Sequence, residues 1–398
     1  MAPMGSPACA PTGSSETAVT MSAAMTTLTD AFEDSSTDGG ATDHALPVAV
    51  ISWPTVPVEI IRAAGLRPVV IRGESTATPL ADATLEADVF PNRLRQLVEA
   101  VLAGRLRRTA CVVLPRTSDA DYKAFLYLRE LIRREVTPLR PPILLFDLLQ
   151  SEGPDVRAYD AARTRDLFAT LASLGQRSAS ADDVRDAIVG ANTARAAMRR
   201  LLALRQGAPR VAGAEVLPLL GAFWRLAPDD YAALAGEAAE VLGRRPPLEG
   251  PRVMLAGAPV DGPQLHAAIE AHGAIVVAEP GPWGSEAAGE DIVSGDDPFA
   301  AIAEWYRRQA IGARTPLATV RQRMQSLMDD VDAVVVAVPP DDTASGWDYP
   351  CLRAWLEARQ VPHTRLFGDS TVPPGPEEHE RIAALVAAAR ERMGTRHG

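Results

Sequence analysis

Short apolar runs of strand length alternate with stretches of helical periodicity through the first third of the chain. The runs rich in β-branched residues are 48–52, 68–71, 111–114 and 143–146. Between them, apolar residues recur every three or four positions at 58–64, 92–103 and 122–132, which is typical of amphipathic helices. This alternation of strand and helix predicts a parallel sheet with right-handed crossovers.

The pattern changes in the middle of the chain and then returns. Only helical periodicity is present through 156–243, and the three prolines of 243–251 mark its end. The segments AVISWPTVPVEIIRAAGLRPVVI and RVMLAGAPVDGPQLHAAIEAHGAIVVA, one on each side, share the order strand, proline-containing turn, helix, glycine, strand. We therefore predict an α/β protein with two similar lobes, each a parallel sheet flanked by helices, joined by an all-helical section.

Four segments follow from these changes of pattern. They are a tail at 1–45, a first α/β lobe at 46–150, a helical section at 151–250 and a second α/β lobe at 251–398. The tail mixes Met, Ser, Thr, Ala and Pro with acidic residues and has no apolar core, so we expect it to be disordered. It lacks the basic start and the apolar stretch of a secretory signal.

Composition narrows the classes of function. The net charge of −11 argues against a duplex nucleic-acid binder, because phosphate contact needs a concentrated basic surface. No uncharged apolar run approaches the roughly 20 residues of a membrane span. The cysteines Cys9, Cys111 and Cys351 are far apart without metal-ligand spacing, and unpaired thiols fit a cytoplasmic protein. We expect Cys111 and Cys351 to be small buried apolar residues.

The turn that follows the run 111–114 is the most informative stretch for chemistry. Arg116, Ser118 and Asp119 lie there, and ligands in open α/β sheets bind beyond the carboxyl ends of the strands. Ser118 with Asp121 three residues later also resembles a capping box, so a purely local helix-capping role is the alternative. Nucleotide-loop, serine-hydrolase and zinc-protease motifs are absent from the sequence.

Three stretches suggest a family. PVEIIRAAGLRPVVIRG at 57–73 resembles the N-terminal signature of the 2-hydroxyacyl-CoA dehydratase and benzoyl-CoA reductase subunit family. RVMLAGAPVD at 252–261 and IEAHGAIVV at 269–277 look like its second-lobe signature, and the resemblance covers roughly 47–393. It implies two similar subunits that each hold a 4Fe-4S cluster on three cysteines, and an ATP-dependent activator that supplies one electron. The implied chemistry is loss of water from an acyl-CoA, a lyase reaction, or reduction of an aryl-CoA ring.

The sequence departs from that family where the cluster would be held. The three family cysteines would fall near 89–91, at Ser118 and near 341–343, and none of these positions is a cysteine. Oxygen and apolar side chains are poor ligands for a thiolate-held cluster. We therefore predict that this chain binds no cofactor or metal itself and that the 4Fe-4S cluster lies on a paralogous partner subunit, in a heterodimer.

Polar and aromatic residues after the predicted strands are expected to meet in one cleft. We predict Arg116, Ser118 and Asp119 as catalytic residues of an acyl-CoA site. The predicted substrate-binding residues are Trp53, Thr55, Arg72, Glu279, Trp283, Asp341 and Asp342. The alternative for all of them is solvated loops and helix caps. Two other functions stay open, a non-catalytic acyl-CoA-binding or scaffold protein and an iron-independent enzyme that uses Ser118.

Overall fold

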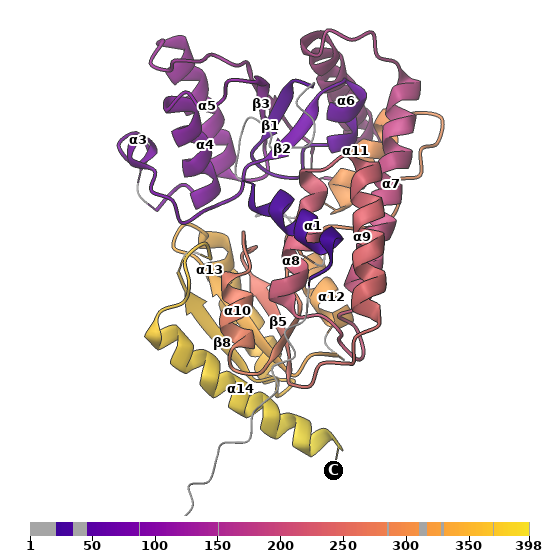
Figure 1. Cartoon of the computed structure of the whole chain (residues 1–398). Helices are drawn as coiled ribbons and strands as arrows, with labels where there is room; N and C mark the ends of the chain where they lie inside the picture. Colours follow the sequence, from indigo (N-terminus) through magenta and orange to yellow (C-terminus); the bar gives the residue numbers. More distant parts are fainter. Residues whose placement is uncertain are drawn as a thin grey trace, which may run out of the picture.

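The computed structural model describes residues 21–34, 46–86, 88–149, 151–284, 286–309, 317–327, 330–368 and 370–397. It contains two four-stranded parallel sheets, each flanked by helices, so the predicted fold class is confirmed (Figure 1). The two sheets have equivalent strand orders, β2-β1-β3-β4 and β6-β5-β7-β8. The same order in both sheets is the structural counterpart of the shared sequence plan.

The first sheet is built from runs that the sequence predicts. Its strands are β1 (Val48–Ile51), β2 (Arg67–Val70), β3 (Thr109–Pro115) and β4 (Ile143–Phe146). The helices of this lobe are α2 (Val58–Ala63), α3 (Pro79–Asp82), α4 (Asn92–Leu102) and α5 (Asp119–Arg133). Alternate side chains enter different cores: Val50 and Val112 pack with α4 and α5, and Ile51 and Val113 pack with α2 and the helical section. Both faces are therefore covered, as parallel sheets require.

The second sheet repeats this arrangement with smaller cores. Its strands are β5 (Arg252–Gly257), β6 (Ile275–Ala278), β7 (Ala333–Val338) and β8 (His363–Phe367). Its helices are α10 (Gln264–Glu270), α12 (Leu317–Leu327), α13 (Thr343–Glu357) and α14 (Pro376–His397). Leu255 packs with α10 and α14, whereas Ala256 packs with α12 and α13. The two lobes also touch directly, where the Asn92 amide donates to the Thr371 hydroxyl over 3.3 Å.

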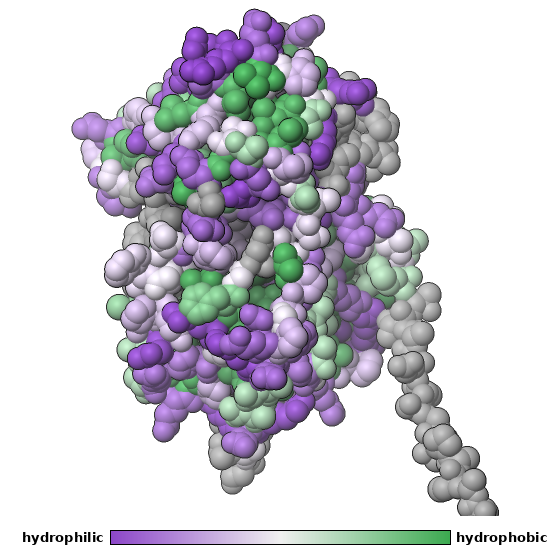
Figure 2. Space-filling model, turned by 90° about the vertical axis from the view of Figure 1, so that its left-hand side faces the viewer, coloured by the Kyte–Doolittle hydropathy of each residue, from purple (hydrophilic) through white to green (hydrophobic). Residues whose placement is uncertain are grey.

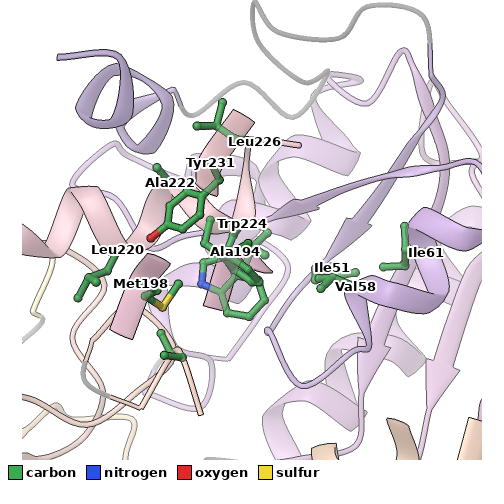
Figure 3. Close-up of a cluster of buried hydrophobic side chains, with 14 of the residues drawn as sticks. Ile51, Val58, Ile61, Ala194, Met198, Leu220, Ala222, Trp224, Leu226 and Tyr231 are labelled. Atoms are coloured by element: carbon green, nitrogen blue, oxygen red, sulfur yellow. The ribbon is translucent and has the colours of Figure 1, made fainter. Parts of the chain in front are cut away.

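A helical section runs along one side of both lobes (Figure 1). It consists of α6 (Pro154–Leu174), α7 (Ala181–Ala203), α8 (Gly213–Gly221), the 3-10 turn η1 (Ala222–Trp224) and α9 (Pro228–Gly243). Helix α11 (Pro298–Gln309) follows the second-lobe strand β6 in sequence but packs against α6 and α7. Figure 3 shows Ala194, Met198, Trp224 and Tyr231 gathered in this section, with Ile51 of the first lobe beside them. The helical section and the first lobe therefore share one core.

The tail contains a helix that the sequence analysis did not predict. Helix α1 (Ala23–Glu33) begins at Ser22, whose hydroxyl accepts the Met25 N–H, and buries Leu28 and Phe32 against α8 and α9. The expectation of disorder is therefore wrong for residues 23–33, because apolar residues at helical spacing find a partner surface far along the chain. Residues 1–20 and 35–45 of the predicted tail, Cys9 included, lie outside the described part.

A second difference concerns Cys351. Helix α13 begins at Thr343, capped by Asp342, and Cys351 lies inside this helix. Cys351 is exposed, and the expectation that it is buried is wrong; Cys111 is buried as expected. Pro350 obscured the helix in the sequence, because proline inside a helix removes a hydrogen bond.

Polar side chains cover most of the face shown in Figure 2, and apolar ones form separate patches on the upper and lower parts. The surface is hollowed at the level between the two parts. Among the described helices, none combines the length and apolar character that crossing a bilayer requires.

Candidate functional site

A hollow of about 360 Å³, its opening to solvent included, lies where the two lobes and the helical section meet. Its walls are Trp53, Pro54, Thr55, Trp224, Pro282, Glu286, Ala287, Trp305, Tyr306 and Gln309. The first three follow β1, and Pro282 to Ala287 follow β6, so the hollow lies beyond the carboxyl ends of one strand from each sheet. In open α/β sheets this is where ligands bind. We call it the aromatic pocket.

The rings of the aromatic pocket have their polar atoms satisfied elsewhere in the protein. The Trp224 indole N–H donates to the Pro282 carbonyl over 3.0 Å, and that of Trp305 donates to the Glu290 carbonyl over 2.7 Å. The Tyr306 hydroxyl donates to Glu59 over 2.8 Å. These three rings therefore offer carbon surface to anything that enters.

Tyr306 is held by a fully buried network. Its hydroxyl also accepts the Val58 N–H at the start of α2, over 3.2 Å, and Glu59 is ion-paired with Arg195 of α7. Burial and the neighbouring Glu59 carboxylate raise the pKa of Tyr306 well above its ordinary value. The Arg195 guanidinium lies 4.2 Å from the centre of the Trp305 ring. One ion pair thus fixes both α11 aromatic residues.

The pocket walls also include two polar side chains, Thr55 and Glu286, which differ in their hydrogen bonding. The Thr55 hydroxyl is buried and has no hydrogen-bond partner among the described residues. The Glu286 carboxylate accepts the Gly281 N–H over 2.9 Å and lies 3.3 Å from the Arg323 guanidinium. Burial nevertheless raises the pKa of Glu286. A buried hydroxyl without a partner costs free energy unless something in the pocket meets it.

The predicted catalytic residue Ser118 caps α5. Its hydroxyl accepts the Asp121 N–H over 3.1 Å and donates to the Asp121 carboxylate over 2.7 Å. That carboxylate is buried, accepts from the hydroxyls of Ser52 and Thr117, and is ion-paired with Arg93 over 3.0 Å. The local alternative, helix capping, is therefore the role that the geometry gives to Ser118.

The hydrogen-bonded group of Ser118, Asp121 and Arg93 nevertheless contacts the aromatic pocket, because Arg93 stacks on Trp53. The Arg93 guanidinium lies 4.6 Å from the centre of the Trp53 ring. Arg116 is ion-paired with Asp147 over 3.2 Å and stacks on Tyr122, and Asp119 is exposed on the first turn of α5. Of the three predicted catalytic residues, Ser118 is thus joined to the pocket indirectly, through Asp121 and Arg93.

The structure separates the predicted substrate-binding residues. Trp53 and Thr55 line the aromatic pocket. The Arg72 guanidinium lies 4.1 Å from the centre of the Phe32 ring in α1. The rings of Phe32 and Trp283 form a T-shaped pair, and the Trp283 indole N–H donates to Asp261 over 3.1 Å.

The remaining three predicted residues lie in the second lobe. Glu279 is fully buried against Arg205 and His266. Asp341 is half-buried beyond β7, and Asp342 caps α13 by accepting the Ser345 N–H over 3.0 Å.

Sequence reasoning missed Trp224, Trp305, Tyr306 and Glu286. The adjacent pair Trp305 and Tyr306 on a predicted helix was the available signal. Nothing in the local pattern says that α11 leaves its own lobe to pack against α6.

The described cysteines do not suit a thiolate-held cluster. Cys111 points into the core from β3, and burial raises the pKa of its thiol to about 12, which disfavours the thiolate. Cys351 lies on α13 of the other lobe. Within the described residues, no three His, Cys, Asp or Glu side chains are grouped so that they could hold a metal ion. The absence of a cluster on this chain stays a prediction. Its only support is that the side chains at the positions of the family cysteines are poor ligands for iron–sulfur clusters.

The family model described as 2-hydroxyglutaryl-CoA dehydratase, D-component, matches residues 55–387. The matched range begins at Thr55 in the aromatic pocket and extends through both sheets to α14. No curated protein matches the chain.

Proposed function

The chain belongs to the 2-hydroxyglutaryl-CoA dehydratase D-component family, and we propose that it is the acyl-CoA-binding subunit of a two-subunit enzyme whose iron–sulfur cluster lies on the partner. The observation that carries the proposal is the aromatic pocket beyond the carboxyl ends of both sheets, inside the matched range. The reaction class is dehydration or reduction of an acyl-CoA, and the partner's cluster would supply the electron.

In this proposal the chain binds and orients the acyl group. The indole rings of Trp53, Trp224 and Trp305 remove water from around it, and a dry site strengthens the electrostatic interactions inside it. The Thr55 hydroxyl donates a hydrogen bond to the thioester oxygen, which gives this buried donor the partner that it lacks. Tyr306 holds the pocket floor through Glu59 and does not itself exchange a proton.

Three measurements test this function. Tryptophan fluorescence of the purified chain should be quenched by an acyl-CoA in a saturable way, since three indoles line the pocket. The chain alone should contain no stoichiometric iron or acid-labile sulfide. If a cysteine-bearing paralogue is encoded beside this chain, co-expression of the two should yield a brown complex with acyl-CoA turnover. Stoichiometric iron and sulfide on this chain would contradict the division of labour.

The scaffold alternative predicts tight acyl-CoA binding with no turnover even in the presence of that paralogue. The Ser118 alternative predicts turnover by the isolated chain that Ser118→Ala abolishes. The geometry does not favour it, because the Ser118 hydroxyl and the Asp121 carboxylate are already committed to each other, to Arg93 and to the α5 cap.

A further inference from the structure

The charges around the aromatic pocket restrict what can enter it. None of the described residues that line it is a cation. The two nearest stacked guanidiniums, Arg93 behind Trp53 and Arg195 behind Trp305, lie outside the rings and are neutralised by Asp121 and Glu59. A negative group in the pocket would therefore find no unpaired positive charge among these residues.

Glu286 makes binding of a negatively charged group in the pocket still less favourable. It is the one acidic residue among those that line the pocket, and Arg323 and the Gly281 N–H already engage its carboxylate. A second carboxylate beside it would be desolvated and repelled, and burial of an unpaired charge is among the most costly events in a protein.

The walls favour a flat apolar group. Trp53, Trp224, Trp305 and Tyr306 supply four aromatic rings, and those of Trp224, Trp305 and Tyr306 have their polar atoms satisfied elsewhere. Aromatic rings that pack on one another are favoured beyond the area that they bury. A planar ring would use these walls better than a flexible chain, which also loses more conformational freedom on binding.

We infer that the aromatic pocket takes an uncharged, ring-bearing acyl group whose oxygen accepts a hydrogen bond from Thr55, and that it rejects acyl groups that end in a carboxylate. This inference rests on the proposed acyl-CoA function. It distinguishes this chain from the 2-hydroxyglutaryl-CoA substrate for which its family is named, because a hydroxyglutaryl group would bring a free carboxylate into a pocket whose only charged wall residue among the described ones is Glu286.

Calorimetric titration of the purified chain with four CoA thioesters tests the inference. The probes are benzoyl-CoA, hexanoyl-CoA, glutaryl-CoA and acetyl-CoA, with free CoA as the reference for contacts to the carrier. Benzoyl-CoA should bind most tightly, hexanoyl-CoA less tightly, and glutaryl-CoA roughly 100-fold more weakly than benzoyl-CoA and no better than acetyl-CoA. Equal or tighter binding of glutaryl-CoA would overturn the inference while leaving the proposed function intact. If no thioester binds more tightly than free CoA, both fall.

Variants locate the effect in this pocket. Thr55→Val should weaken benzoyl-CoA binding about tenfold, since it removes one hydrogen bond and keeps the side-chain shape. Thr109→Val is the matched control, because the Thr109 hydroxyl is also buried without a hydrogen-bond partner among the described residues but lies outside the pocket walls. It should leave the affinity unchanged.

Glu286→Gln should strengthen glutaryl-CoA binding at least tenfold and change benzoyl-CoA binding little, because the amide removes the repulsion. An unchanged ratio between the two ligands would show that another group sets the selectivity. That result would also overturn the inference.

Discussion

A buried Arg–Glu ion pair joins each of the two lobes to the helical section, but the two pairs have different consequences. Arg195 of α7 pairs with Glu59 in the first lobe, and Arg205, just after α7, pairs with Glu279 in the second, all four side chains being fully buried. The third member is Tyr306 in the first case and His266 in the second. Tyr306 lines the aromatic pocket and His266 does not. The first pair therefore positions the candidate site, whereas the second only holds a lobe in place.

The second pair should give the largest effect on stability. Arg205→Met leaves the Glu279 carboxylate buried without its bidentate partner, which costs about 3–5 kcal/mol of unfolding free energy. Urea denaturation followed by circular dichroism measures this. The double variant Arg205→Met/Glu279→Leu should recover most of the loss, because no buried charge remains. A loss of unfolding free energy below about 1 kcal/mol in the single variant would show that Glu279 is not buried with Arg205 as its essential partner.

Tyr306, the third member of the first network, should affect stability less than Arg205 and binding more. Tyr306→Phe leaves the Glu59 carboxylate and the Val58 N–H each short of one partner, which costs about 1–3 kcal/mol. It should also weaken acyl-CoA binding, because the ring is no longer fixed. Tyr127→Phe is the matched control, since its hydroxyl donates to Glu86 at an exposed site. If both variants behave alike in binding, Tyr306 does not position the pocket.

The second pair should also make stability depend on pH. Burial alone would raise the pKa of Glu279, but Arg205 and His266 outweigh it and hold the pKa well below its ordinary value. A lowered carboxyl pKa stabilises the fold above the unfolded value of about 4.3, and this stabilisation is lost as the pH falls below it. The difference in unfolding free energy between the wild type and Glu279→Gln should therefore shrink from pH 7 to pH 3. A constant difference would contradict the lowered pKa.

The smallest effect on stability is expected in the pocket itself. Thr55→Val removes a buried hydroxyl that has no partner among the described residues, so it should leave the unfolding free energy unchanged or raise it by up to about 1 kcal/mol. Thr164→Val in α6 provides the contrast, because that hydroxyl donates to the Asp160 carbonyl over 2.9 Å and its loss should destabilise. A clear loss of stability in Thr55→Val would mean that the protein itself satisfies this hydroxyl.

The sequence predicts well what depends on local pattern and strand direction. The β-branched runs predicted both sheets, and the rule that ligands bind at the carboxyl ends of strands singled out Trp53 and Thr55 after β1. Ser118 as a helix cap was also within reach, since capping is decided over three residues.

What the sequence could not give depends on contacts between distant segments. Glu279 was predicted to bind substrate because it follows a strand. In the structure its carboxylate is buried in an ion pair with Arg205, 74 residues away in the sequence. Trp305 was missed because α11 packs outside the lobe from which its sequence comes. Helix α1 was missed because its partner surface lies on α8 and α9.

The central claim is that the aromatic pocket binds the acyl group of an acyl-CoA. The most direct test is the dissociation constant of benzoyl-CoA for the wild type and for Trp305→Leu, with thermal unfolding to verify that the variant is folded. Loss of one stacking wall should weaken benzoyl-CoA binding about tenfold and leave free CoA binding unchanged. Equal affinities of the two folded proteins for benzoyl-CoA would contradict the claim.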